Sequence, residues 1–177
     1  KARRRMPCGV KNTDSSGTDT PTKSLSPAHG WRNPIVNFES SKWTRDREAT
    51  EAVIVHSITR AETAKELDII HRRAGYLCAG VHFVVDASGS STTRHPDTIG
   101  HHLSGWDTHS IGVAIVGWDG KDQLPADLDA HAHDLLDSIY HHYHVTAVAA
   151  PTLLGIEGYG PLQEFVREAN ARRPTVS

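Results

Sequence analysis

Histidines are the side chains of this sequence with the widest capacity for chemistry, and 177 residues contain thirteen of them. His56 directly follows a short β-branched run, Ala52-Val-Ile-Val55, which is typical of a buried strand. An imidazole at the end of a strand can bind a metal or transfer a proton near neutral pH. His56 is therefore the first candidate for a functional residue.

Other common chemistries are not favoured. The sequence contains no Gly-x-Ser-x-Gly turn, no phosphate-binding P-loop and no Cys-x-x-Cys pair. Ser57 adjoins His56, but consecutive residues of a strand point to opposite faces, so the two cannot form a nucleophile and its base. Five further histidines lack the i, i+4 spacing of a helical metal chelate, and we interpret 140–144 as a solvated helix end. These five are His131, His133, His141, His142 and His144.

Strand and helix patterns alternate along the chain. Strands are expected at 52–56, 81–85, 110–116 and 145–154, and helices at 63–74, 125–143 and 161–172. The run 110–116 is almost entirely apolar, which predicts a central strand buried on both faces. The sequence therefore predicts an α/β fold, a mixed central sheet with helices on both faces, preceded by a long extended N-terminal arm.

The two parts of the chain differ in charge. Residues 1–47 carry ten Lys/Arg against four Asp/Glu, whereas residues 48–177 carry nine against seventeen. We expect a basic arm at 1–47 and a folded domain at 48–177, with the arm lying on a partner or on its own domain. Trp31, Phe38 and Trp43 are its expected anchors on other protein subunits, and Arg3, Arg4 and Arg5 could make a weak electrostatic contact with nucleic acid.

Membrane insertion and a disulfide framework are not expected. No run approaches the roughly 18 apolar residues of a membrane span. The only cysteines are Cys8, in the arm, and Cys78, in the domain, so we predict that disulfides do not form a scaffold here.

An ordered series of motifs within residues 52–173 resembles the zinc-dependent N-acetylmuramoyl-L-alanine amidase family, which includes phage amidase-lysozymes and peptidoglycan recognition proteins. The matching stretches are Ala52 to His56, Ile70 to Tyr76, Gly80-Val-His-Phe-Val-Val85, Arg94, and His102-Leu-Ser-Gly-Trp-Asp-Thr-His-Ser-Ile-Gly-Val113. The resemblance implies a cleft that binds muropeptide and a zinc ion that cleaves the amide between muramic acid and L-alanine.

The resemblance also implies which residues should hold the metal, and most of these are missing. His56 occupies the position of the first ligand. The family's Tyr, second His ligand and Cys or Asp ligand are replaced by Val81, Ile156 and Gly160. We therefore expect no catalytic residue at these three positions, no bound zinc, and His56, His102 and Trp106 as the remnant of a ligand site or pocket.

The preferred hypothesis is a catalytically degenerate amidase-like domain, used as a structural or binding subunit of a larger assembly. By analogy with phage relatives we expect that assembly to be a virion, as capsid decoration, tail or baseplate. The alternative is an active N-acetylmuramoyl-L-alanine amidase, a peptidoglycan hydrolase whose zinc site has moved to His56, His102 and Glu157. A third hypothesis is an adaptor or inhibitor in which the arm is the active part.

Overall fold

The computed structural model describes residues 50–151 and 160–174. They form a five-stranded sheet in the order β3-β2-β4-β1-β5. The strands are β1 (Ala52–Ile58), β2 (Phe83–Asp86), β3 (Gly89–Thr92), β4 (Ser110–Val116) and β5 (Ala147–Ala149). β4 lies parallel between β1 and β2, and β5 is parallel to β1. Because β3 pairs antiparallel with β2, the sheet is mixed, as predicted.

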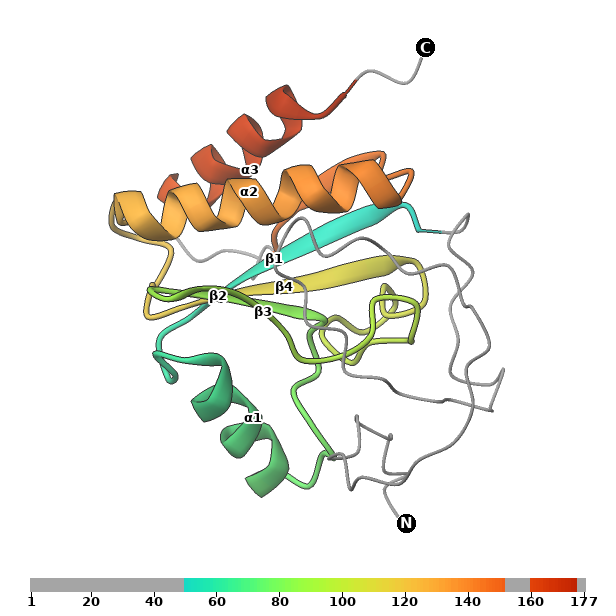
Figure 1. Ribbon diagram of the computed structural model, residues 1–177, viewed down its shortest axis with the longest axis vertical. Coiled ribbons are helices and arrows are strands. Elements are labelled where there is room, and N and C mark those ends of the chain that lie inside the picture. Colours follow the sequence, from blue (N-terminus) through green and yellow to red (C-terminus); the bar gives the residue numbers. More distant parts are fainter. Residues whose placement is uncertain (1–49, 152–159, 175–177) are drawn as a thin grey trace, which may run out of the picture.

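Helices cover both faces of this sheet (Figure 1). α2 (Ala126–His142) and α3 (Gly160–Arg172) lie on one face, and α1 (Ala64–Arg73) lies on the other. Successive residues of a strand point to opposite faces of the sheet, so the strands contribute to a separate apolar core on each face. Val53 and Val55 belong to the larger apolar core together with Leu135 of α2 and Phe165 of α3, whereas Ala114 joins the smaller core that contains Leu67 of α1. The predicted α/β architecture is confirmed.

The first helix begins and ends where the sequence predicts. The Thr63 hydroxyl accepts a hydrogen bond from the Glu66 N–H (3.2 Å), and the Glu66 carboxylate accepts one from the Glu62 N–H (2.9 Å). Gly75 follows the helix with a φ of 93°, a conformation that glycine adopts without a steric penalty. The helices at 126–142 and 160–172 also agree with their predictions to within a residue or two.

Three strand predictions need correction. β3 was not predicted, because its sequence, Gly-Ser-Ser-Thr, carries no apolar residue and 86–89 was assigned to a turn. β2 begins at Phe83, two residues later than predicted. The predicted strand 145–154 is present only at Ala147–Ala149. Its last part lies outside the described residues.

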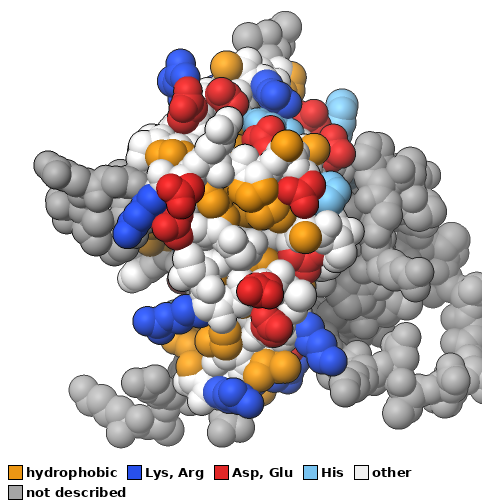
Figure 2. Space-filling model, turned by 90° about the vertical axis from the view of Figure 1, so that its left-hand side faces the viewer, with side chains coloured by type: hydrophobic (Ala, Val, Ile, Leu, Met, Phe, Trp, Pro, Cys, Tyr) orange, Lys and Arg blue, Asp and Glu red, His pale blue; other side chains and the backbone are white. Residues whose placement is uncertain are grey.

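No helix among the described residues is long and apolar enough to cross a membrane. In Figure 2, Lys and Arg side chains lie at both the upper and the lower end of the face, and the histidines visible in this view lie in its upper half.

Candidate functional site

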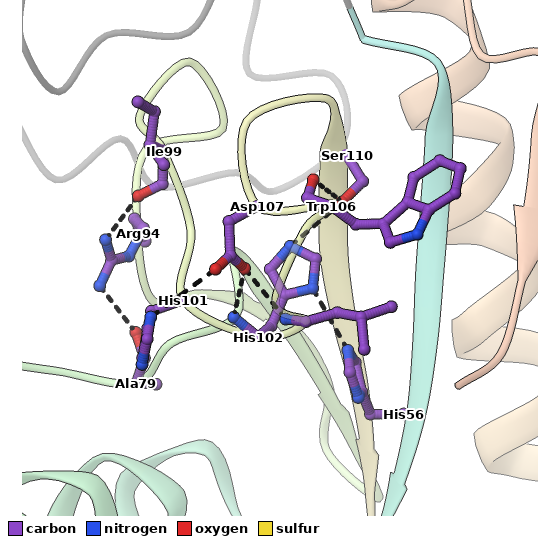
Figure 3. Close-up of polar contacts among 10 residues, drawn as sticks. His56, Ala79, Arg94, Ile99, His101, His102, Trp106, Asp107 and Ser110 are labelled. Carbon is purple, nitrogen blue, oxygen red and sulfur yellow. Dashed lines mark hydrogen bonds and ion pairs between the residues drawn. The ribbon is translucent and has the colours of Figure 1, made fainter. Parts of the chain in front are cut away.

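His56 and His102 come together on the face of the sheet that α1 shares. His56 lies on β1 opposite Ala114 of β4, and His102 belongs to the loop that precedes β4. His56 Nε2 and His102 Nδ1 are 3.3 Å apart, so one ring donates a hydrogen bond to the other (Figure 3). The rings meet edge to face, with centroids 5.4 Å apart. The structure thus places the two predicted histidines in one hydrogen-bonded pair.

A glycine allows His102 to lie flat against the sheet. A Cβ atom on Gly112 of β4 would come within 2.6 Å of two atoms of the His102 ring. Real Cβ atoms do not approach heavy atoms so closely, so any side chain there would displace the imidazole. The far nitrogen of His102, Nε2, is 3.5 Å from the hydroxyl of Ser110, which itself donates to the Trp106 carbonyl (2.7 Å). These contacts fix both the position and the tilt of His102.

Asp107 holds the loop in shape. One carboxylate oxygen accepts hydrogen bonds from the N–H groups of His102 (2.7 Å) and Leu103 (2.9 Å) (Figure 3). The other oxygen lies 3.6 Å from His101 Nδ1. Bonds from backbone N–H groups to a carboxylate are stronger than neutral ones, so Asp107 positions His102 from the backbone side.

His82 is a buried member of this group that alternation along its predicted strand could not place. Its Nδ1 accepts a hydrogen bond from the Gly112 N–H (2.9 Å), so the ring proton must be on Nε2, which donates to the Thr98 carbonyl (2.8 Å). Both nitrogens are therefore used, and the ring is neutral. His82 packs edge to face with His102 at 5.6 Å and supports it from below the surface.

Burial keeps His56 neutral. The pKa of His56 is lowered to about 4, chiefly by loss of hydration and also by the neighbouring His102, while Asp107 opposes the shift. Burial also lowers the pKa of His71. His71 accepts a hydrogen bond from the Gly80 N–H (2.9 Å), which gives it a structural role. At neutral pH His56 thus presents an uncharged imidazole.

One pocket is lined by His102, and a second pocket adjoins the first. The smaller, about 250 Å³, is lined mainly by residues with polar side chains, such as His71, Tyr76, His101 and His102, and we call it the polar pocket. The larger, about 490 Å³, is mostly apolar and is lined by Trp106 together with Ile54 and Ala149. Leu103 and Ser104 line both, so the pockets are neighbours. Trp106 is 45% exposed, which leaves an aromatic ring available to a ligand.

A model of the N-acetylmuramoyl-L-alanine amidase family matches residues 46–158, more than half of the chain. The chain belongs to this family. Among curated relatives, the endolysin of Escherichia phage T7 is 33% identical over 78 residues, 41% of this chain and 52% of that protein. The endolysin of Enterobacteria phage K11 is 27% identical over 105 residues, 56% of this chain and 70% of that protein. The chain thus spans about half the length of the T7 relative.

Solved structures of amidases and recognition proteins share the fold of this amidase-family chain. The amidase LysC from Clostridium intestinale superposes with a TM-score of 0.58 at 19% identity, covering 76% of this chain and 95% of that one. Wild-type Drosophila PGRP-LB gives a TM-score of 0.59 at 15% identity, covering 76% and 89%. At such identities the likeness concerns the fold alone.

The described residues do not fit the zinc ion that the family implies. The described residues contain no group of three or more His, Cys, Asp or Glu that could hold a metal. Val81 is buried in the apolar core beneath α1, and Gly160 has no side chain and is exposed at the start of α3. Ile156 and Glu157 lie outside the described residues.

Two further sets of predicted residues have different outcomes. The arm anchors Trp31, Phe38 and Trp43, and the basic residues Arg3, Arg4 and Arg5, all lie outside the described residues. At the other end of the domain, His141, His142 and His144 are exposed around the end of α2. The predicted solvated helix terminus is confirmed for these three histidines, whereas Tyr143 in the same segment is buried.

Cys78 is disulfide-bonded, and a single bond is not the disulfide framework that the sequence was predicted to lack. No cysteine among the described residues is free. Cys78 is buried beside Arg94, whose guanidinium donates to the Cys78 sulfur and to the Ala79 carbonyl, both at 3.3 Å, and to the Ile99 carbonyl at 2.8 Å. The spacing of the two cysteines in the sequence gave no signal for this bond.

Proposed function

We propose that this chain acts on bacterial peptidoglycan, and that it binds muropeptide on the face that carries His56, His102 and Trp106. The observation that carries the proposal is the hydrogen-bonded pair of His56 and His102, in which His102 lines one pocket and that pocket adjoins a second one lined by Trp106. An apolar pocket with an exposed indole can hold a sugar ring, and a polar pocket beside it can bind the peptide and its carboxylates. Membership of the amidase family supports this class of ligand.

The main proposal is binding without cleavage. Val81 and Gly160 bring neither a phenol nor a metal ligand to the face that family members use. A single histidine ligand cannot hold a catalytic zinc ion, which takes three protein ligands and one open position. The remaining side chains can still orient a ligand through hydrogen bonds and an aromatic surface.

Amide hydrolysis is the second candidate, and the relatives favour it over a structural subunit of a phage particle. The curated relatives from phages K11, T7, KP32 and T3 are all named endolysins. His56 Nε2 and His102 Nδ1 also lie at a separation that two ligands of one tetrahedral zinc ion can have. An N-acetylmuramoyl-L-alanine amidase would need a third ligand from outside the described residues, and Glu157 is the residue that the sequence offers.

Binding and cleavage are separable in one set of measurements. Binding is measured as co-sedimentation with purified peptidoglycan and by titration with muramyl tripeptide. Trp106→Ala is expected to weaken binding at least about tenfold, because a truncated aromatic anchor commonly costs more than 1 kcal/mol. Gly160→Ala is the matched control, since a methyl group there meets no atom within 4 Å.

Cleavage is measured as new L-alanine amino termini released from peptidoglycan, with metal content determined on the same sample. Binding with no release and no stoichiometric zinc supports the main proposal. Release that a chelator abolishes, and that His56→Ala and Glu157→Gln both abolish, supports the second candidate. Neither binding nor release would contradict both.

A further inference from the structure

A separate pocket of about 510 Å³ lies between the beginnings of α2 and α3, and we call it the acidic pocket. Three carboxylates and three apolar side chains line it: Asp129, Glu164, Glu168, Leu124, Pro161 and Phe165. α2 and α3 cover the face of the sheet opposite α1 (Figure 1). The acidic pocket is therefore on the other side of the sheet from His56 and His102.

The carboxylates of the acidic pocket are only partly neutralised. Glu164 pairs with Arg167 of the same helix (3.0 Å), whereas no Lys or Arg of the described chain forms an ion pair with Asp129 or Glu168. Figure 2 shows the side on which both helices begin, and acidic side chains lie around an apolar area in its upper half. Carboxylates near the start of a helix also stabilise that helix, so their number alone does not indicate a ligand.

A buried histidine provides a second, independent observation. The His133 side chain is 5% exposed, and its Nε2 atom is buried without a hydrogen-bond partner. Nε2 lies 3.4 Å from Asp129 Oδ1 without forming a hydrogen bond to it, and the His133 ring packs on Phe165 with centroids 4.9 Å apart. Both neighbours line the acidic pocket, so the unused nitrogen faces its wall.

His133 is neutral at pH 7. Burial is the largest cause that lowers its pKa, and the positive charge of Arg172 also lowers it. Three carboxylates oppose the shift: Asp129, Asp137 and Glu168. A neutral imidazole that carries its proton on Nδ1 offers Nε2 as an acceptor, so His133 can receive a hydrogen bond from a donor in the pocket.

These features fit an organic cation. The described residues hold no group of three or more His, Cys, Asp or Glu placed to bind a metal ion. An ammonium group has three donors, and at about 2.9 Å its nitrogen can contact two acceptors 3.4 Å apart, the separation of Asp129 Oδ1 and His133 Nε2. Asp129 is 39% exposed, so its side chain can turn to admit this group. The apolar walls suit the four methylene groups of a lysine stem.

We propose that the acidic pocket binds a lysine side chain of a partner protein, with the ammonium held by Asp129, Glu168 and the Nε2 atom of His133. Residues 48–177 carry nine Lys/Arg against seventeen Asp/Glu, and this charge attracts a basic partner. A partner bound there leaves the muropeptide face open, because the two sites lie on opposite sides of the sheet. The inference does not depend on the proposed function.

The ligand class is tested by titrating Nα-acetyl-lysine N-methylamide into the full chain and following backbone amide signals by NMR. We expect saturable shifts at Asp129 and Phe165, together with a shift of the His133 ring nitrogens. The norleucine analogue of the probe keeps the four-carbon stem and lacks the ammonium group. It should bind at least about tenfold more weakly, because it makes no charge-assisted hydrogen bond.

The residues of the site are tested with variants that keep the side-chain volume. Asp129→Asn and Glu168→Gln should each weaken binding of the lysine probe about tenfold, and the loss should shrink in high salt. His133→Phe keeps a ring against Phe165 and removes Nε2, so it should also bind more weakly. Asp134→Asn changes an exposed carboxylate of α2 that does not line the acidic pocket, and this control should bind as the wild type does.

Shifts that do not saturate, or equal binding of the lysine and norleucine probes, would overturn the inference. Unchanged binding by Asp129→Asn and His133→Phe, or an equal loss in Asp134→Asn, would overturn the assignment of the site. None of these measurements uses peptidoglycan, so their failure is distinguishable from failure of the proposed function.

Discussion

At the scale of single residues, the neutral state of His56 links its burial to stability. The pKa of His56 is lowered to about 4 in the folded protein, against 6.5 for an ordinary histidine. Between these values the unfolded chain binds a proton that the folded protein does not, so stability is present above pH 6.5 and is lost as pH falls towards 4. This difference in proton binding lowers the unfolding free energy by about 2 kcal/mol between pH 7 and pH 5.

The first prediction follows directly. His56→Gln should reduce the loss of unfolding free energy between pH 7 and pH 5 by about 2 kcal/mol, as measured by urea denaturation at both pH values. His141→Gln, at an exposed position at the end of α2, is the control. If the two variants show the same pH dependence as the wild type, His56 is not held neutral.

A second residue-scale prediction concerns Gly112. Gly112→Ala places a methyl group 2.6 Å from the His102 ring, so the ring must move away from His56. We expect a loss of about 1–3 kcal/mol in unfolding free energy together with weaker muropeptide binding. Gly160→Ala meets no neighbouring atom and should leave both unchanged. Unaltered binding by Gly112→Ala would show that the histidine pair does not contact the ligand.

At the scale of elements, the loop between His101 and His109 depends on one carboxylate. Asp107→Ala removes two charge-assisted hydrogen bonds to backbone N–H groups, and we expect it to lower the unfolding free energy by about 2–3 kcal/mol. Hydrogen exchange at the His102 and Leu103 amides should also become faster. Asp127→Ala, in the first turn of α2, is a control that leaves this loop intact. Unchanged exchange would mean that other contacts hold the loop.

The elements also show which parts of the structure could be predicted from the sequence. Apolar alternation and helix caps predicted the α/β sheet and all three helices, because these signals arise from local burial and from backbone hydrogen bonds. β3 was not predicted, because its polar residues form no apolar pattern. It is a strand only through its pairing with β2. His56 and His102 were predicted as site residues. Their contact depends on the missing side chain of Gly112, which leaves room for the His102 ring, and residue spacing in the sequence does not show this.

At the scale of the whole molecule, the sequence holds two cysteines, Cys8 and Cys78, and Cys78 is disulfide-bonded. Such a crosslink restricts the unfolded chain, and we expect Cys8→Ser to lower the unfolding free energy by about 2–4 kcal/mol. Cys78→Ser should cost more, since it also alters a buried side chain next to Arg94. An unfolding midpoint that is identical for the wild type and Cys8→Ser would contradict the crosslink.

The proposed assembly role of the arm is tested at the same scale. Deletion of residues 1–47 should abolish incorporation into a larger particle if the arm binds other protein subunits. The measurement is sedimentation of the truncated and full chains with the purified assembly. The variant Trp31→Ala, Phe38→Ala, Trp43→Ala keeps the basic residues and separates anchoring by aromatic side chains from attraction by charge. Normal incorporation of both variants would rule out this role.

The position of β1 has a consequence for how the chain folds. β1 is the first strand of the domain, yet its neighbours in the sheet come much later: Ala52 pairs with Ser110 and with Ala147, 58 and 95 positions along the chain. During synthesis its apolar side chains have no strand partner until most of the domain has left the ribosome. Contacts between such distant segments slow folding, so a nascent chain stopped before β4 should be a target for chaperones and proteases.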